Sequence, residues 1–151
     1  MELRKIKYNS DKVEIKYDID NDSYRLSSYD KPRPEFIEAM QKLVEPLVEI
    51  CEFQEGYGDT IDIISVSISH SKGIMGATIT GLKKLDTSYA PLVINTPHLP
   101  TEDYSGNNPN APILPDIAVK RIEGLIEEAE LYINGKRSQL SILDDMEVSN
   151  N

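Results

Sequence analysis

Residues 61–82, IDIISVSISHSKGIMGATITGL, carry the pattern that decides the fold. Two apolar runs of strand length, 61–69 and 74–82, flank the turn sequence 70–73, HSKG, so the stretch predicts a β-hairpin. The apolar phase changes at Ile63-Ile64, which predicts a bulge in the first strand. Beyond the bulge, alternate positions carry hydroxyl groups that face away from the core if Ile79 points into it. These are Ser65, Ser67, Ser69, Thr78 and Thr80.

Three shorter strands are predicted before this hairpin, at 3–8, 13–17 and 24–28, joined by the turn sequences Asn-Ser-Asp and Asp-Asn-Asp. In the second strand, Val13, Ile15 and Tyr17 share one face, whereas charged residues occupy the other. This alternation is typical of a sheet with one solvated face, and such a sheet is usually antiparallel.

Two amphipathic helices are predicted around the hairpin. The first begins at Pro34, and Pro46 should kink or end it near Val44. The second covers 116–134, with Gly135 as its stop. The pattern predicts the α+β class, with a five-stranded, mostly antiparallel sheet and two helices packed on one face. We expect residues 1–135 to form a single domain and residues 136–151 to form a flexible tail.

Composition narrows the class of protein. A chain of 151 residues with 39% apolar and 28% charged residues is typical of a globular domain. No apolar run approaches a membrane span, and the single Cys51 fits a reducing compartment, so we expect a cytoplasmic protein. The net charge of −10 would repel the phosphates of a nucleic-acid backbone, so we do not expect the chain as a whole to bind nucleic acid directly.

Catalytic and metal-binding residues are scarce. The chain offers two histidines, His70 in the hairpin turn and His98 between prolines, and one cysteine. No sequence motif groups them as a catalytic or metal site requires, and no glycine-rich loop joins a strand to a helix. We therefore expect a non-enzymatic protein with no cofactor and no metal.

The hydroxyl-lined strands suggest a ligand site. Ser65, Ser67, Ser69, Thr78 and Thr80, with His98 and the nearby Lys72, Lys83 and Lys84, could receive an anionic ligand or another chain. Simple solvation of an antiparallel sheet predicts the same pattern, so both interpretations stay open. The segment 95–115, which holds five prolines, is long for a passive connection and is expected to be a functional or mobile loop.

The C-terminal segment contains a short apolar peptide, Gln139-Leu140-Ser141-Ile142-Leu143. It resembles the peptide by which many bacterial replication and repair proteins dock on the DNA sliding clamp, although Ile142 and Leu143 replace the Leu-Phe pair of that peptide. Loss of the aromatic group predicts a weaker contact. Gln139, Leu140, Ile142 and Leu143 are the candidate partner-binding residues. Packing against the chain's own domain and a contact within a homo-oligomer are the alternatives.

Three segments together resemble small phage and prophage proteins of Gram-positive bacteria that are encoded near recombination and replication genes. They are YRLSSYDKPRPEF from Tyr24, MGATITGLKKL from Met75 and NTPHLPTEDYSG from Asn95. The resemblance implies a phage-type accessory of DNA replication or recombination that binds a protein partner, such as the host sliding clamp. The alternative is a phage anti-defence protein that binds a host defence protein or sequesters a nucleotide signal.

Overall fold

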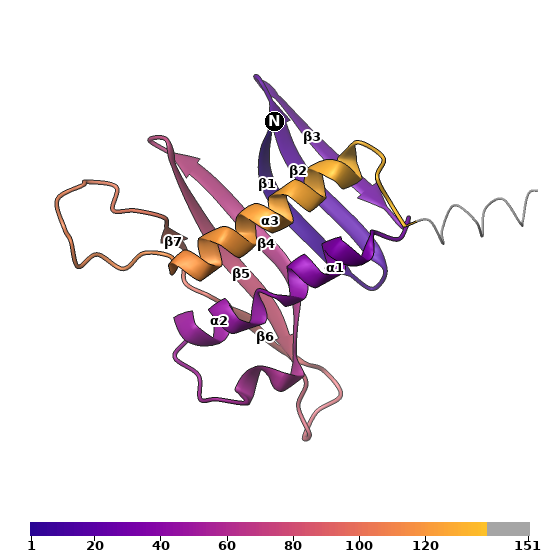
Figure 1. Cartoon of the computed structure of the whole chain (residues 1–151). Coiled ribbons are helices and arrows are strands. Elements are labelled where there is room, and N and C mark those ends of the chain that lie inside the picture. The colour runs from indigo at the N-terminus through magenta and orange to yellow at the C-terminus, as the bar shows by residue number, and fades with distance from the viewer. Residues whose placement is uncertain (139–151) are drawn as a thin grey trace, which may run out of the picture.

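The computed structural model describes residues 1–138 (Figure 1). The partner-binding residues expected at 139–143 lie outside the described part of the chain. In chain order the elements are β1 (Glu2–Asn9), β2 (Lys12–Ile19), β3 (Asp22–Ser28), α1 (Pro34–Gln41), α2 (Val44–Ile50), η1 (Tyr57–Thr60), β4 (Ile61–Ser71), β5 (Ile74–Lys83), β6 (Leu92–Asn95), β7 (Leu99–Pro100) and α3 (Asp116–Ile133).

The strands form one antiparallel sheet in the order β3-β2-β1-β4-β5-β6, with β7 also paired to β5. The N-terminal three-stranded meander joins the hairpin through β1 and β4, where Ile6 lies opposite Val66. The predicted bulge in β4 is confirmed, because the register of the β4–β5 pair shifts between Ile63 and Ser65. The α+β class and the antiparallel pairing are therefore confirmed.

The number of strands differs from the expected five. All five predicted strands are present, but β6 and β7 extend the sheet beyond β5. β6 has only four residues and β7 has two, one of them Pro100, so neither carries a visible period-2 pattern. Their pairing depends on contacts with β5 that a local pattern does not reveal.

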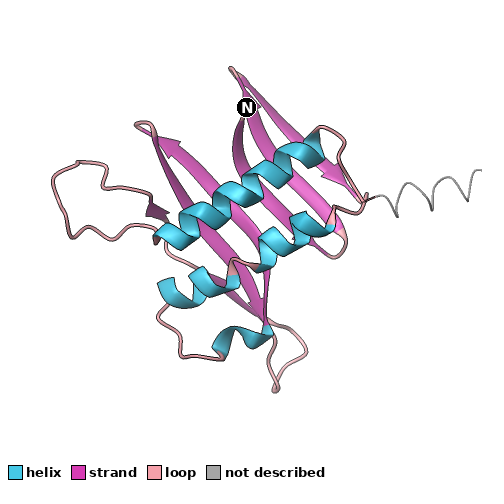
Figure 2. Cartoon of the chain, in the orientation of Figure 1, coloured by secondary structure: helices cyan, strands magenta, loops and turns pink. Residues whose placement is uncertain are grey.

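Within residues 1–138, all the helices lie on one face of the sheet and leave the other face open (Figures 1 and 2). The predicted break near Val44 is confirmed, since α1 ends at Gln41 and α2 begins at Val44, but α2 is a helix of its own, so residues 1–138 contain three α-helices and not the expected two. Pro46 is tolerated there because it lies in the first turn of α2, where the amide hydrogens have no partner within the helix.

The core lies between this helical layer and the sheet. Phe36 of α1 is 1% exposed and packs against the rings of Tyr8 from β1 and Tyr132 from α3. Aliphatic residues from every layer complete the core; those with no exposed surface are Ile6, Val13, Ile15, Val66, Ala77, Ile79, Met40, Leu43, Leu47, Ala118, Ile122, Leu125 and Ala129. None of the helices in residues 1–138 is long and apolar enough to cross a membrane.

Candidate functional site

The open sheet face, which is the face opposite the helices, brings together the hydroxyl residues that the sequence suggested. We call Ser65, Ser67, Ser69, Thr78 and Thr80 the hydroxyl stripe. Ser65 lies opposite Thr80 and Ser67 opposite Thr78, so the stripe runs along the β4–β5 pair. Ser67 is exposed, whereas Ser65 is only 6% exposed and offers a ligand little surface.

His98 extends this stripe toward the edge of the sheet. Its Nε2 lies 2.8 Å from Ser69 Oγ and its Nδ1 lies 3.2 Å from Thr78 Oγ1. The ring lies over Gly76, where an added Cβ would be 2.6 Å from Nε2, so glycine is needed there to admit the imidazole. The structure therefore gathers all six candidate ligand-binding residues on one face.

The start of the predicted long loop is held against the sheet rather than extending freely from it. The amide of Thr96 donates to the carbonyl of Ile79 at 2.9 Å, and the amide of Ile79 donates to Thr96 Oγ1 at 2.9 Å. Thr80 Oγ1 donates to Asn95 Oδ1 at 2.6 Å. These bonds fix His98, two residues further on, in its place over β5.

The contacts of His98 are hydrogen bonds to two hydroxyl groups. The Ser69–His98 distance is one that a nucleophile and its base also show. Within residues 1–138, however, the second ring nitrogen contacts the Thr78 hydroxyl and no carboxylate. The same residues contain no group of three or more His, Cys, Asp or Glu that could hold a metal ion.

One lysine that was expected beside the stripe points the other way. Lys83 Nζ donates to the Tyr57 carbonyl at 2.8 Å and to Thr60 Oγ1, and lies 4.2 Å from the centre of the Tyr57 ring. Strand alternation explains this direction, because Lys83 pairs with the buried Ile61. The expectation that Lys83 supports an anion site on the hydroxyl face is wrong.

The basic groups of the open face come instead from the N-terminal meander. Lys5 lies directly opposite Lys16, Lys16 lies opposite Arg25, and on its other side Lys5 lies opposite Ser67. We call Lys5, Lys16 and Arg25 the cation row; it continues into the hydroxyl stripe without a break. The alternation in β2 already placed Lys16 on the solvated face. Its position beside the stripe required knowing that β1 pairs with β4.

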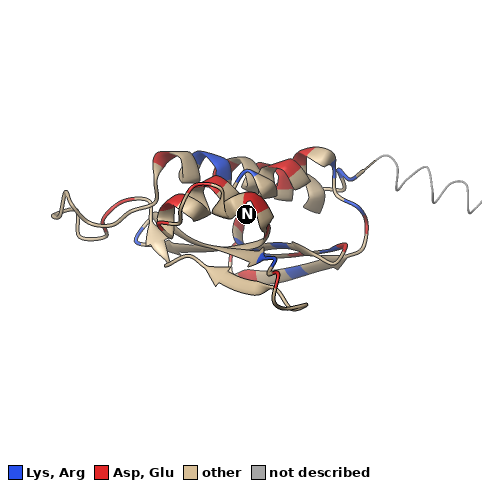
Figure 3. Cartoon of the chain, turned by 90° about the horizontal axis from the view of Figure 1, so that it is seen from below, with Lys and Arg blue, Asp and Glu red and all other residues tan. Residues whose placement is uncertain are grey.

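Two carboxylates on this face, Asp18 and Glu14, already form ion pairs, Asp18 with Arg4 at 2.6 Å. Glu14 contacts Arg25 at 2.9 Å, Lys12 at 3.5 Å and Lys7 at 3.8 Å. The hydrogen bond from Arg25 is the main reason that the pKa of Glu14 lies below its ordinary value. Among residues 1–138, Lys5 and Lys16 form no ion pair. Figure 3 shows acidic residues along the helices on the opposite side of the molecule.

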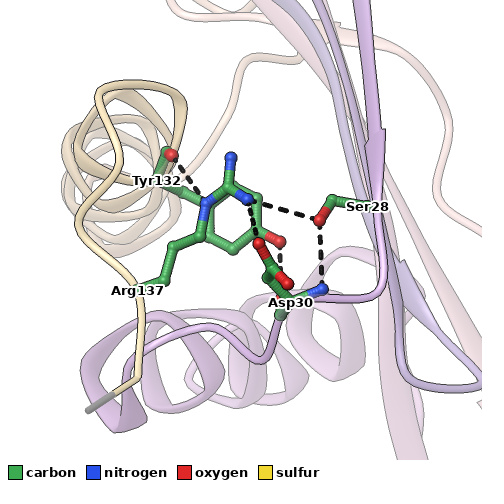
Figure 4. A network of polar contacts seen from close by, with 4 residues as sticks. All are labelled: Ser28, Asp30, Tyr132 and Arg137. Carbon is green, nitrogen blue, oxygen red and sulfur yellow. Dashed lines mark hydrogen bonds and ion pairs between the residues drawn. The ribbon is translucent and has the colours of Figure 1, made fainter. Parts of the chain in front are cut away.

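A second cluster, the C-terminal anchor, consists of Ser28, Asp30, Tyr132 and Arg137 (Figure 4). Arg137 pairs with Asp30 at 2.5 Å, and its guanidinium carbon lies 4.3 Å from the centre of the Tyr132 ring. The Tyr132 hydroxyl donates to the Asp30 carbonyl at 2.5 Å. The amide of Ser138 donates to the carbonyl of Lys31 at 2.9 Å. The chain is thus held to the domain through Ser138, three residues beyond the expected domain end.

Comparisons of the chain with protein-family models, with curated proteins and with solved structures find no match. The resemblance to phage proteins stays a prediction.

Proposed function

We propose that the chain is a non-enzymatic binding protein that captures an anionic ligand on its open sheet face. The observation that carries this proposal is the continuous arrangement of the cation row, the hydroxyl stripe and His98 across five neighbouring strands. Ammonium, guanidinium and hydroxyl groups are the donors that anions require. In a phage setting, such a protein would act against host defence by sequestering a nucleotide signal.

The uncovered state of this face also supports the proposal. Within residues 1–138, the helices cover only the opposite face, and the buried apolar residues lie between the helices and that face. A solvated sheet needs polar residues but has no need of lysines directly opposite one another, since like charges across a strand pair are destabilising. A ligand that carries negative charge would offset this repulsion.

Changing Ser67 to glutamate should weaken anion binding without unfolding the domain. Ser67 is exposed and lies beside Lys5, so the new carboxylate would neutralise the lysine and repel an anion. A thermal-shift screen with cyclic AMP, cyclic GMP and cyclic di-AMP measures the effect. We expect stabilisation of the wild-type protein by at least one nucleotide, and an affinity at least about tenfold lower for S67E.

The matched control is Thr87→Glu, which adds the same charge at an exposed position outside the sheet. Its nucleotide response should equal that of the wild-type protein. If no nucleotide changes the melting temperature, or if S67E and T87E respond alike, the open face is not the binding surface.

A second candidate function is an accessory of DNA replication or recombination that docks on a protein partner, such as the host sliding clamp, through residues 139–143. The C-terminal anchor favours it, because Arg137 and Ser138 fix the chain immediately before this peptide. A peptide that starts from a fixed point holds the domain near its partner and raises the effective concentration of a second contact.

Alanine in place of both Leu140 and Leu143 should weaken clamp binding by at least about tenfold, because buried aliphatic anchors contribute most of the binding energy of a short peptide. Isothermal titration calorimetry of the full chain against the bacterial sliding clamp measures this change. Met146→Ala is the matched control, since it shortens an apolar side chain outside the peptide. Absence of binding by the wild-type chain, or equal affinity of the double variant and the control, would contradict the docking role.

A further inference from the structure

A shallow hollow of about 370 Å³ lies on the open sheet face over β1, β2 and β3. We call it the basic hollow. Arg4, Lys16, Asp18, Ser23 and Arg25 line it, with Tyr17 and Tyr24 between them along the strands. Lys16 and Arg25 belong to the cation row, so the hollow adjoins Lys5 and the hydroxyl stripe.

The charges of the basic hollow are unbalanced. Three cationic side chains and one carboxylate, that of Asp18, line it, and Arg25 is also paired with Glu14 at 2.9 Å beside it, so positive charge still exceeds negative charge by one. Asp18 accepts from Arg4 Nε at 2.6 Å and from Ser23 Oγ at 2.8 Å. The bond from Arg4, followed by the one from Ser23, lowers the pKa of Asp18, so it stays ionised and holds Arg4 in place. Lys16 forms no ion pair within residues 1–138, which leaves its ammonium group for a ligand.

The geometry points to the basic hollow as the site for the phosphate group of a small phosphate-bearing molecule, with Arg4, Lys16 and Arg25 as its charged contacts and the hydroxyl stripe beside the rest of the ligand. This inference rests on the proposed anion-binding function and names its ligand class and its centre. Guanidinium groups bind phosphate oxygens through two parallel hydrogen bonds, and a lysine adds a mobile point charge.

Size and charge favour a small molecule over a nucleic-acid strand. A volume of about 370 Å³ lies within the range of small-ligand sites. A long polyanion would also meet the remaining negative charge of a chain whose net charge is −10. A compact ligand that stays within the hollow avoids this repulsion.

The test is a titration of the full chain with inorganic pyrophosphate and with ADP at low salt. Binding is monitored through the amide chemical shifts in NMR spectra. The largest shift changes should fall on residues 4–5, 16–18 and 23–25. Lys16→Gln should weaken binding of both probes about tenfold, and Lys16→Arg should restore most of the affinity. Lys120→Gln, which removes an exposed lysine from α3 on the helical side, should leave affinity unchanged.

Folding of the Lys16→Gln variant is checked by its melting temperature, which should be no lower than that of the wild-type protein because a like-charge contact is removed. The inference would be overturned if the Lys16→Gln and Lys120→Gln variants bound the probes with equal affinity. It would also be overturned if the chemical-shift changes were confined to other strands. If the S67E change weakens nucleotide binding while K16Q does not affect it, the basic hollow is excluded and the proposed function stands. An oligonucleotide that binds far more tightly than ADP and pyrophosphate would also overturn the inference, in favour of a nucleic-acid surface.

Discussion

Replacing Phe36 with alanine should lower the free energy of unfolding by about 3–5 kcal/mol, the range found when a buried aromatic ring is deleted. Phe36 is 1% exposed. Its ring centre lies 6.3 Å from that of Tyr8 and 5.9 Å from that of Tyr132, so one side chain joins β1, α1 and α3. Its loss removes apolar contacts and leaves a cavity between the sheet and the helical layer.

Urea denaturation followed by circular dichroism measures this effect. Glu38→Ala is the matched control on the same helix, because Glu38 is exposed and alanine is a good helix former. We expect the control to change the free energy of unfolding by less than about 0.5 kcal/mol. A loss below about 1 kcal/mol for Phe36→Ala would mean that the aromatic cluster does not hold the two layers together.

The sequence predicted the elements whose side chains alternate regularly or fall on one helical face. Val13 and Ile15 of β2 are fully buried as their alternation indicated, and Pro46 marks the break before α2. β6 and β7 escaped prediction because four residues and two residues give no period, and because their bonds go to a strand found earlier in the chain. Short edge strands are defined by their neighbours rather than by their own residues.

The part of the candidate site that depends on local alternation was predictable, and the part that depends on long-range strand pairing was not. Serines and threonines at alternate positions of one hairpin share a face independently of the rest of the fold. His98 was predicted as a ligand-binding residue together with them. The cation row could not be assembled from local patterns, because it needs β1 to lie beside β4, far along the chain. The direction of Lys83 was missed for a related reason, since the turn η1 that supplies its partners, Tyr57 and Thr60, was not predicted.

The C-terminal anchor gives the second large effect. Tyr132→Ala should lower the free energy of unfolding by about 3–5 kcal/mol, because Tyr132 is 1% exposed and its ring contacts both Phe36 and Arg137. Tyr132→Phe keeps the ring and removes only the hydroxyl that donates to the Asp30 carbonyl, so we expect a loss of about 1 kcal/mol. The difference between the two variants in urea denaturation measures what the ring contributes.

Alkaline pH tests the same hydroxyl without a change of packing. Burial is the main reason that the pKa of Tyr132 is raised above its ordinary value of 10.0, and burial raises the pKa of Tyr8 in the same way. A pKa that is higher in the folded state means that the neutral hydroxyl is favoured by folding. The resulting stability is fully present below about pH 10 and is lost as the pH rises through the raised pKa values.

Stability measured from pH 8 to pH 11 should therefore fall at the alkaline end, and it should fall less in Tyr132→Phe, where one of the two ionisations is removed. An identical pH dependence in the wild-type and Tyr132→Phe proteins would show that the anchor hydroxyl is no more buried in the folded chain than in the unfolded one.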